Sequence, residues 1–429
     1  MEDSLIGFAV LLAFCFVGVP MGFALVAVGF AGFALERSFP AAFATVGQQV
    51  QDVATNYGFS VLPLFLLMGT FIHRAALSED LYDASNAWLG HLRGGLAMAT
   101  ITACGGLAAV SGSSLATAAT MGKIAIPSMR RYAYADSLAG GAVAVGGTLG
   151  ILIPPSVPMV IYGILTQGDI GKLFIAGVLP GILMVCLLMM VVALLTRIRP
   201  DLGPPGEKQS WEVRLRALAN VWGVLLLFAI VIGGMYTGVF TPTEAAGIGA
   251  AGAFLFALFR RRLTWATFAA ALVEAGETTC VILTVTLGAL IFSNFLDLSG
   301  LPSALAEWIK SLHLGPVPVI LAMCGIYIIL GCLFDSLAML ILTVPVFFPI
   351  TQTLGIDPIW FGIIVIIVVE IGLITPPVGM NVFIIKGMFK DMPIWTIFAG
   401  VMPFLVAQFV GLGLIIVFPE IALILPRLM

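Results

Sequence analysis

Two short segments, 222 residues apart, combine residue types that can hold a small cation inside an apolar protein. The first is Gly150-Ile-Leu-Ile-Pro-Pro155 and the second is Gly372-Leu-Ile-Thr-Pro-Pro377. Proline has no N–H and disfavours helical geometry in the residue before it, so carbonyl oxygens near each pair lose their helical partners. Alkali cations bind such carbonyls together with hydroxyl oxygens. Each segment is therefore a candidate for part of a Na+ site.

Polar residues that could complete each site lie upstream of each segment, in Ser111-Gly-Ser-Ser114 and in Gly331-Cys-Leu-Phe-Asp-Ser336. An ionisable group near the middle of an apolar segment, as Asp335 is, by default marks function. Small residues taken alone often serve only close helix packing, which is the alternative interpretation. We predict two Na+ sites, the first from Ser111, Ser113, Ser114, Gly150, Ile153 and Pro155, and the second from Gly331, Asp335, Ser336, Gly372 and Thr375.

Residues beside the breaks are candidates for contact with a transported molecule. The predicted membrane core offers no obvious basic partner for an anion, so helix N-termini and backbone amides would have to meet one. Asn381 follows Pro377 by four residues and could donate a hydrogen bond to a ligand. The predicted substrate-binding residues are Asn381, Ser156, Pro155 and Pro377. Glu370 is open to either a structural or an ion-coupling role.

The offset of 222 residues recurs along the chain, which indicates a duplicated unit. It also relates Pro20 to Pro242, Ser114 to Ser336, Pro127 to Pro349 and Asp169 to Asp391. In membrane proteins, segments broken by Gly and Pro at matching places in two halves point to a transport site at the repeat interface.

The composition is that of a polytopic membrane protein, with 61% hydrophobic residues, 10% charged residues and a mean hydropathy of +1.14. The first apolar run follows an acidic Met-Glu-Asp without a basic region, so we interpret it as a retained span and not as a signal peptide. The six Cys and three His form no metal-binding spacing, and no basic tract suggests nucleic acid.

Apolar runs and their breaks predict an all-α fold of two repeats, each with a re-entrant hairpin and a transmembrane helix broken at Pro-Pro. A linker at 197–220 separates the repeats. The first repeat, 1–196, contains scaffold helices at about 1–75, an interfacial arm at 78–92, a hairpin at 94–131, and a broken helix and final span at 134–196. The second, 221–429, contains the same parts at 221–293, 300–313, 316–350 and 357–420. The run 5–35 is either one long span or two short ones.

The distribution of positive charge predicts that the second repeat is inverted. If the N-terminus lies outside, 14 of the 19 Lys and Arg face inward, four face outward and Lys123 lies in a hairpin leg. Cytoplasmic connections are usually the basic ones, so this orientation is favoured and the linker is cytoplasmic.

With these residues in view, the chain resembles the large membrane subunit of TRAP (tripartite ATP-independent periplasmic) transporters. The resemblance is carried by motifs of both repeats: Thr241-Pro-Thr-Glu-Ala-Ala-Gly247, Asp335-Ser-Leu-Ala-Met339, Glu370-Ile-Gly-Leu-Ile-Thr-Pro-Pro-Val-Gly-Met-Asn381, Ser111-Gly-Ser-Ser-Leu-Ala-Thr-Ala and Gly150-Ile-Leu-Ile-Pro-Pro-Ser.

The resemblance implies an elevator-type secondary transporter of the bacterial inner membrane, coupled to Na+, which imports an organic acid. It also implies two protein partners, a periplasmic substrate-binding protein and a small four-helix membrane subunit. Because the chain begins directly with the large subunit, we expect the small one to be a separate polypeptide. The family's cation sites correspond to the two pairs of segments named above, and membrane lipid surrounds the assembly.

Three alternatives differ in mechanism. A carboxylate carrier of similar inverted-repeat fold would work without a binding protein. A membrane-embedded enzyme acting on lipids would need an Asp-rich metal motif or a Ser/His pair at the bilayer surface, and the sequence contains neither in a recognisable form. A channel would need a continuous pore, which two re-entrant units do not by themselves provide.

Overall fold

The computed structural model describes residues 2–75, 77–313, 315–332 and 334–429, and in these ranges every regular element is a helix. Positions 1 and 76 of the predicted first repeat, and 314 and 333 of the second, lie outside the described residues. Six helices are long and apolar enough to cross a membrane, or up to eight if each bent pair counts as one span. The chain is therefore an all-α, polytopic membrane protein.

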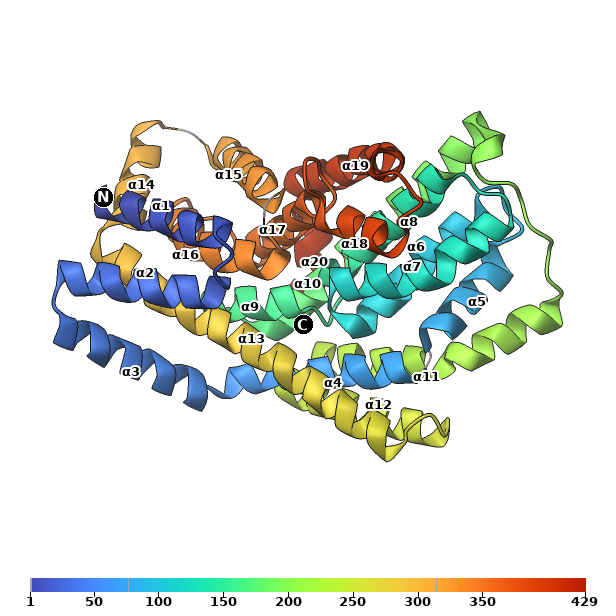
Figure 1. Cartoon of the computed structure of the whole chain (residues 1–429), viewed down its shortest axis with the longest axis horizontal. Coiled ribbons are helices and arrows are strands. Elements are labelled where there is room, and N and C mark those ends of the chain that lie inside the picture. The colour runs from blue at the N-terminus through green and yellow to red at the C-terminus, as the bar shows by residue number, and fades with distance from the viewer. Residues whose placement is uncertain (1, 76, 314, 333) are drawn as a thin grey trace.

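The duplication is visible in the order of the helices (Figure 1). The first half contains α1 (Glu2–Phe16), α2 (Met21–Glu36), α3 (Phe39–Thr55), α4 (Val61–Arg74), α5 (Leu77–Leu89), α6 (Gly95–Ser111), α7 (Ser114–Arg131), α8 (Asp136–Leu152), α9 (Val157–Leu165) and α10 (Ile170–Ile198). The second contains α11 (Trp211–Tyr236), α12 (Pro242–Phe259), α13 (Trp265–Leu298), α14 (Leu301–Ser311), α15 (Pro316–Gly331), α16 (Ser336–Thr353), α17 (Pro358–Gly372), α18 (Met380–Met388), α19 (Ile394–Val417) and α20 (Glu420–Leu428). Shifted by 222 residues, α7 falls on α16 with identical bounds, and α8 and α17 begin together.

The helices near the N-terminus of each half form a scaffold in which the repeats exchange partners. α2 packs on α13 and α4 packs on α12, so each contact joins one repeat to the other. Gly29 permits the first contact, because a Cβ there would lie 2.7 Å from the backbone of Phe292. The run 5–35 forms two helices, α1 and α2, and α3–α4 is bent by 55° where the second repeat has the single 34-residue α13.

The remaining helices interlock the two repeats around the breaks. In each half the hairpin packs on its own broken helix, α6 and α7 on α8, and α15 and α16 on α17. Across the repeats, α7 packs on α18 and α16 packs on α9, while α19 packs on α8 and α10 on α17. The hairpins lie on opposite sides of these central helices in Figure 1, as an inverted arrangement requires.

Side-chain caps begin the helix after each break and thereby set where the chain turns. Ser113 Oγ accepts from the Ala116 N–H at 3.4 Å at the start of α7. Asp335 Oδ1 accepts from the Ala338 N–H at 3.1 Å at the start of α16, and Ser156 Oγ accepts from the Met159 N–H at 3.4 Å at the start of α9. Ser and Asp are favoured at this position because their oxygens satisfy an otherwise unpaired backbone donor.

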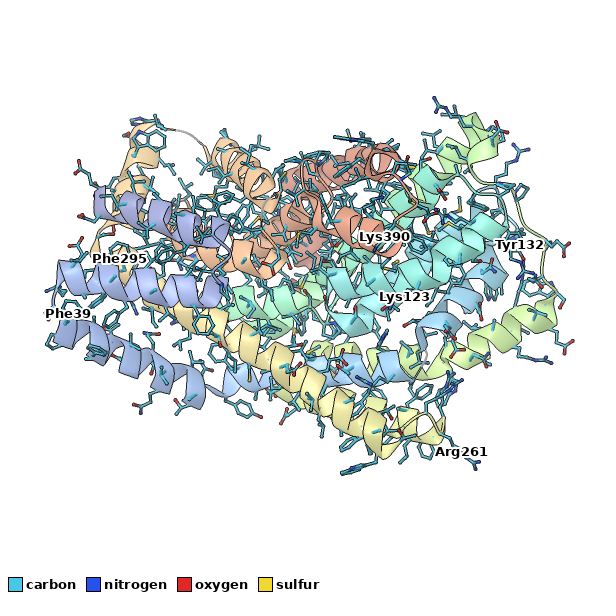
Figure 2. The ribbon with its side chains drawn as sticks, in the orientation of Figure 1. Phe39, Lys123, Tyr132, Arg261, Phe295 and Lys390 are labelled. Atoms are coloured by element: carbon cyan, nitrogen blue, oxygen red, sulfur yellow. The ribbon has the colours of Figure 1, made fainter. Side chains whose placement is uncertain are left out.

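The two ends of the long axis differ in charge. The linker between α10 and α11 and the Arg260-Arg-Arg262 turn between α12 and α13 lie at the right-hand end in Figure 1, while the α2–α3 connection lies at the left-hand end. Tyr132 and Phe39 mark these opposite ends in Figure 2. The more basic end is the cytoplasmic one by the positive-inside rule.

Candidate functional site

Both Pro-Pro breaks carry a cis peptide bond, Pro154-Pro155 and Pro376-Pro377, and both rearrange the backbone in the same way. The second proline of each pair cannot donate to the carbonyl four residues earlier. The first break meets that loss with the Ser156 hydroxyl, which donates to the Ile151 carbonyl at 2.5 Å. At the equivalent place in the second break, the Asn381 backbone N–H donates to the Leu373 carbonyl at 3.1 Å.

The glycine before each of these carbonyls differs between the two breaks. Pro154 leaves the Gly150 carbonyl without its helical donor, since it too has no N–H. The equivalent Gly372 carbonyl accepts from the Thr375 N–H at 3.2 Å. The first break therefore has a carbonyl more available to a cation than the second.

The first hairpin tip lies directly against the first break. A Cβ on Gly150 would lie 2.6 Å from the Ser113 carbonyl, and a Cβ on Gly112 would lie 3.1 Å from the Pro155 carbonyl. Gly112 also ends α6 with a φ of +59°, a conformation that favours glycine. The structure thus places Ser113, Gly150 and Pro155 together, with Ile153 half-buried beside them.

The hydroxyls of this tip are not equally free. Ser111 Oγ and Thr117 Oγ1 lie 2.7 Å apart, and Thr117 donates to the Ser113 carbonyl at 2.8 Å. Ser114 Oγ is buried and has no hydrogen-bond partner among the described residues. A buried hydroxyl without a partner is costly, so this atom fits a site completed by a cation.

The second tip contacts the second break through glycine and sulfur. A Cβ on Gly331 would lie 2.8 Å from Gly372 Cα, and the Cys332 thiol donates to the Pro376 carbonyl at 3.3 Å. Asp335 caps α16, Ser336 follows it, and Thr375 Oγ1 donates to the Ile371 carbonyl at 2.6 Å. The carboxylate therefore already shapes the hairpin, and its charge is what the first tip lacks.

The four predicted substrate residues do not converge on one cavity. Asn381 is buried and its side-chain amide donates to the Ala144 carbonyl of α8 at 3.0 Å. Ser156 is occupied by its cap and by Ile151, Pro155 is buried, and Pro377 is exposed. Their spacing along the chain placed them at the breaks, but the direction of each side chain depends on packing between repeats.

A pocket of about 220 Å³ lies between the scaffold and the first hairpin. The hairpin side supplies Ser111 and Ser113, which belong to the predicted first Na+ site. The polar residues on its wall that are not among the predicted site residues are Thr70 and His73 of α4, Thr120 of α7, and Glu274 and Thr278 of α13. Thr70 and His73, spaced by three, and Glu274 and Thr278, spaced by four, each lie on one helix face, and this was the available sequence signal.

The rim of this pocket is charged. Arg74 pairs with Glu274 at 2.7 Å, which joins α4 to α13 beside His73. His73 lies in the last turn of α4 and lines the pocket, so its interpretation as an ordinary residue of a connecting segment is wrong. A small polar solute here would contact the scaffold and the hairpin tip at once.

The arrangement agrees with what the chain is similar to. Residues 8–421 match the family model of the tripartite ATP-independent periplasmic transporter, DctM component. The chain belongs to this DctM family. Its members are transporter permease subunits, so this DctM protein is a membrane transport protein and not an enzyme.

Two relatives and one solved structure indicate how close the similarity is. The C4-dicarboxylate TRAP transporter large permease protein DctM of Pseudomonas aeruginosa is 39% identical over 379 residues, covering 88% of each chain. The sialic acid TRAP transporter large permease protein SiaM of Vibrio cholerae is 35% identical, covering 100% of this chain and 99% of SiaM. The crystal structure of the Alcanivorax borkumensis YdaH transporter shares the fold with a TM-score of 0.50 and 17% identity, covering 85% of this chain and 86% of its own.

Proposed function

We propose that this DctM protein imports an organic acid across the bacterial inner membrane, driven by a Na+ gradient and supplied by a periplasmic binding protein. The observation that carries the proposal is the first hairpin tip, which contacts the Pro-Pro break on one side and lines the scaffold pocket on the other. One small element thus connects the proposed cation ligands to the proposed substrate space.

Coupling follows from electrostatics at this tip. Ser114 Oγ and the Gly150 carbonyl are oxygen ligands without a full set of partners, and Na+ would supply the missing positive charge. A carboxylate entering the adjacent pocket then meets a cation in a region of low dielectric, where the attraction is strong. Without the cation, the same carboxylate would face hydroxyl and carbonyl oxygens, so each ligand favours binding of the other.

The second site would take Na+ differently. Asp335 supplies a negative charge there, so it would repel a carboxylate substrate and retain a cation. Two unequal sites give a reason for the substrate to bind beside the uncharged first tip.

The proposed motion is an elevator movement of the hairpins and broken helices against the scaffold. Each repeat supplies both parts, and the pocket lies at their boundary. The word "tripartite" in the family's description and the word "large" in the names of its relatives support two further components, a binding protein and a small four-helix membrane subunit on a separate chain.

Dependence on the binding protein distinguishes this proposal from a carrier that works alone. The assembled transporter in proteoliposomes is given an inward Na+ gradient and a labelled organic acid, with and without its cognate binding protein. We expect uptake above background only with the binding protein. Equal uptake in its absence would favour the alternative, a binding-protein-independent carboxylate carrier.

A further inference from the structure

An apolar groove of about 630 Å³ runs between α11 and α12 on the scaffold. Its walls are mostly aliphatic and aromatic, and several of these side chains, such as Trp222, Leu226 and Phe259, are exposed. Exposed apolar surface in a membrane protein faces either lipid or another protein, so the groove has an occupant to be identified.

The other repeat contains a matching groove of about 530 Å³ between α1 and α2, closed by Phe295 of α13. Because α1 and α2 correspond to α11 and α12 in the repeat, the two grooves are equivalent by pseudosymmetry. Their polar ends differ in charge. The α1–α2 groove ends at Asp3 and Glu36, whereas the α11–α12 groove ends at Asn220 and Arg260.

The length of the α11–α12 groove indicates the size of its occupant. Along α11 it extends from Ala219 to Ile230, which at a rise of 1.5 Å per residue is roughly 16 Å. The hydrocarbon core of a bilayer is about 30 Å thick, so the groove covers one leaflet. A partner helix crossing the membrane would need a contact about twice as long, whereas an acyl chain of one leaflet fits.

The basic end of the groove offers unpaired positive charge. Arg260 is engaged, since it pairs with Asp80 and donates to the Asn220 carbonyl. Arg261 and Arg262 follow it, are exposed, and form no ion pair within the described part of the chain. Figure 2 shows the Arg261 side chain directed away from the helices at the α12–α13 turn.

We propose that the α11–α12 groove binds one phospholipid with an anionic headgroup, drawn from the cytoplasmic leaflet. Its acyl chain lies between Trp222, Leu226 and Phe259, and its phosphate meets Arg261 and Arg262 at the mouth. Basic pockets at the cytoplasmic ends of membrane helices suit such headgroups. The α1–α2 groove, with two carboxylates at its polar end, repels the same lipid.

Native mass spectrometry of the delipidated, assembled transporter tests this with phosphatidylglycerol and phosphatidylcholine as probes. We expect one phosphatidylglycerol to be retained in preference to phosphatidylcholine. The double variant Arg261→Gln/Arg262→Gln should weaken its retention by about fivefold for each arginine removed. Arg37→Gln, at the opposite end of the molecule, is the matched control and should leave retention unchanged.

A second variant separates the groove from the charge. Leu226→Trp fills the groove and leaves the arginines in place, so it too should reduce retention of phosphatidylglycerol. Unchanged retention in either this variant or the arginine pair would overturn the proposal. It would also be overturned if a photo-crosslinker at position 226 captured the small membrane subunit in place of lipid.

Discussion

At the scale of single residues, the two breaks use glycine to bring backbone against backbone. Gly150 meets the Ser113 carbonyl and Gly372 meets Gly331, and neither contact leaves space for a Cβ. These residues could be predicted from the sequence because Gly, Ser and Pro recur at one offset. The side-chain direction of Asn381 could not be, since its partner Ala144 belongs to the other repeat and its amide is used up in that contact.

Gly150→Ala should therefore abolish transport without unfolding the protein. The added methyl would lie 2.6 Å from the Ser113 carbonyl, so the hairpin tip must move away from the break. Gly413→Ala is the control, because a Cβ at Gly413 meets nothing within 4 Å. Uptake assays on both variants check this, and normal uptake by Gly150→Ala would mean that the contact between tip and break is dispensable.

Asp335 has two roles that substitution can separate. Asp335→Asn keeps a capping oxygen for α16 and removes the charge, so we expect weaker Na+ activation at nearly unchanged thermal stability. Asp335→Ala removes both, and loss of a cap costs about 1 kcal/mol in addition. Uptake against Na+ concentration, with a melting curve for each variant, measures both effects. Identical behaviour of the two variants in Na+ activation and in stability would be inconsistent with separate roles.

At the scale of elements, one arginine fastens the first hairpin to parts of both repeats. Arg130 at the end of α7 binds both carboxylate oxygens of Asp136 at 2.8 and 2.9 Å and Asp391 at 2.7 Å, and it lies over the Phe389 ring. The helices themselves were predictable from apolar runs and breaks. This junction was not, because it joins residues far apart in sequence and has no copy at the equivalent place in the second repeat.

Arg130→Gln should lower the thermal midpoint of the purified protein by about 2–4 °C, corresponding to roughly 1 kcal/mol for a partly exposed network. Arg216→Gln is the matched control. It breaks a single pair with Glu212 in which both side chains are more than 70% exposed, and should change the midpoint by less than about 1 °C. Equal shifts in the two variants would show that the Arg130 junction does not hold these elements together.

At the scale of the whole molecule, the polar pocket lies between two bodies that each draw on both repeats. The sequence predicted the repeats and their inversion from offset and charge. It did not predict the pocket, since Thr70 and His73 come from α4 and Ser111 and Ser113 from the hairpin. Only the packing of α4 on α6 brings these residues together.

A crosslink across this boundary should stop transport if the bodies move. In a cysteine-free background, Thr70→Cys with Ala116→Cys places one thiol on each wall of the pocket. We expect a bifunctional thiol reagent to block uptake in this variant. Ser4→Cys with Ser299→Cys is the control, because these hydroxyls are hydrogen-bonded within the scaffold and a link there leaves the motion free. Full uptake by the linked Thr70/Ala116 variant would rule out the elevator.

The central claim is that the first hairpin tip binds the Na+ that drives uptake, and the Na+ dependence of Ser114→Ala measures it most directly. Initial uptake into proteoliposomes is recorded with the binding protein over a range of external Na+, with K+ replacing Na+ at constant ionic strength. We predict no uptake in K+, and about a tenfold higher half-maximal Na+ for Ser114→Ala, equal to about 1.4 kcal/mol. Equal uptake in K+, or the same half-maximal Na+ for the variant and the wild type, would contradict the account.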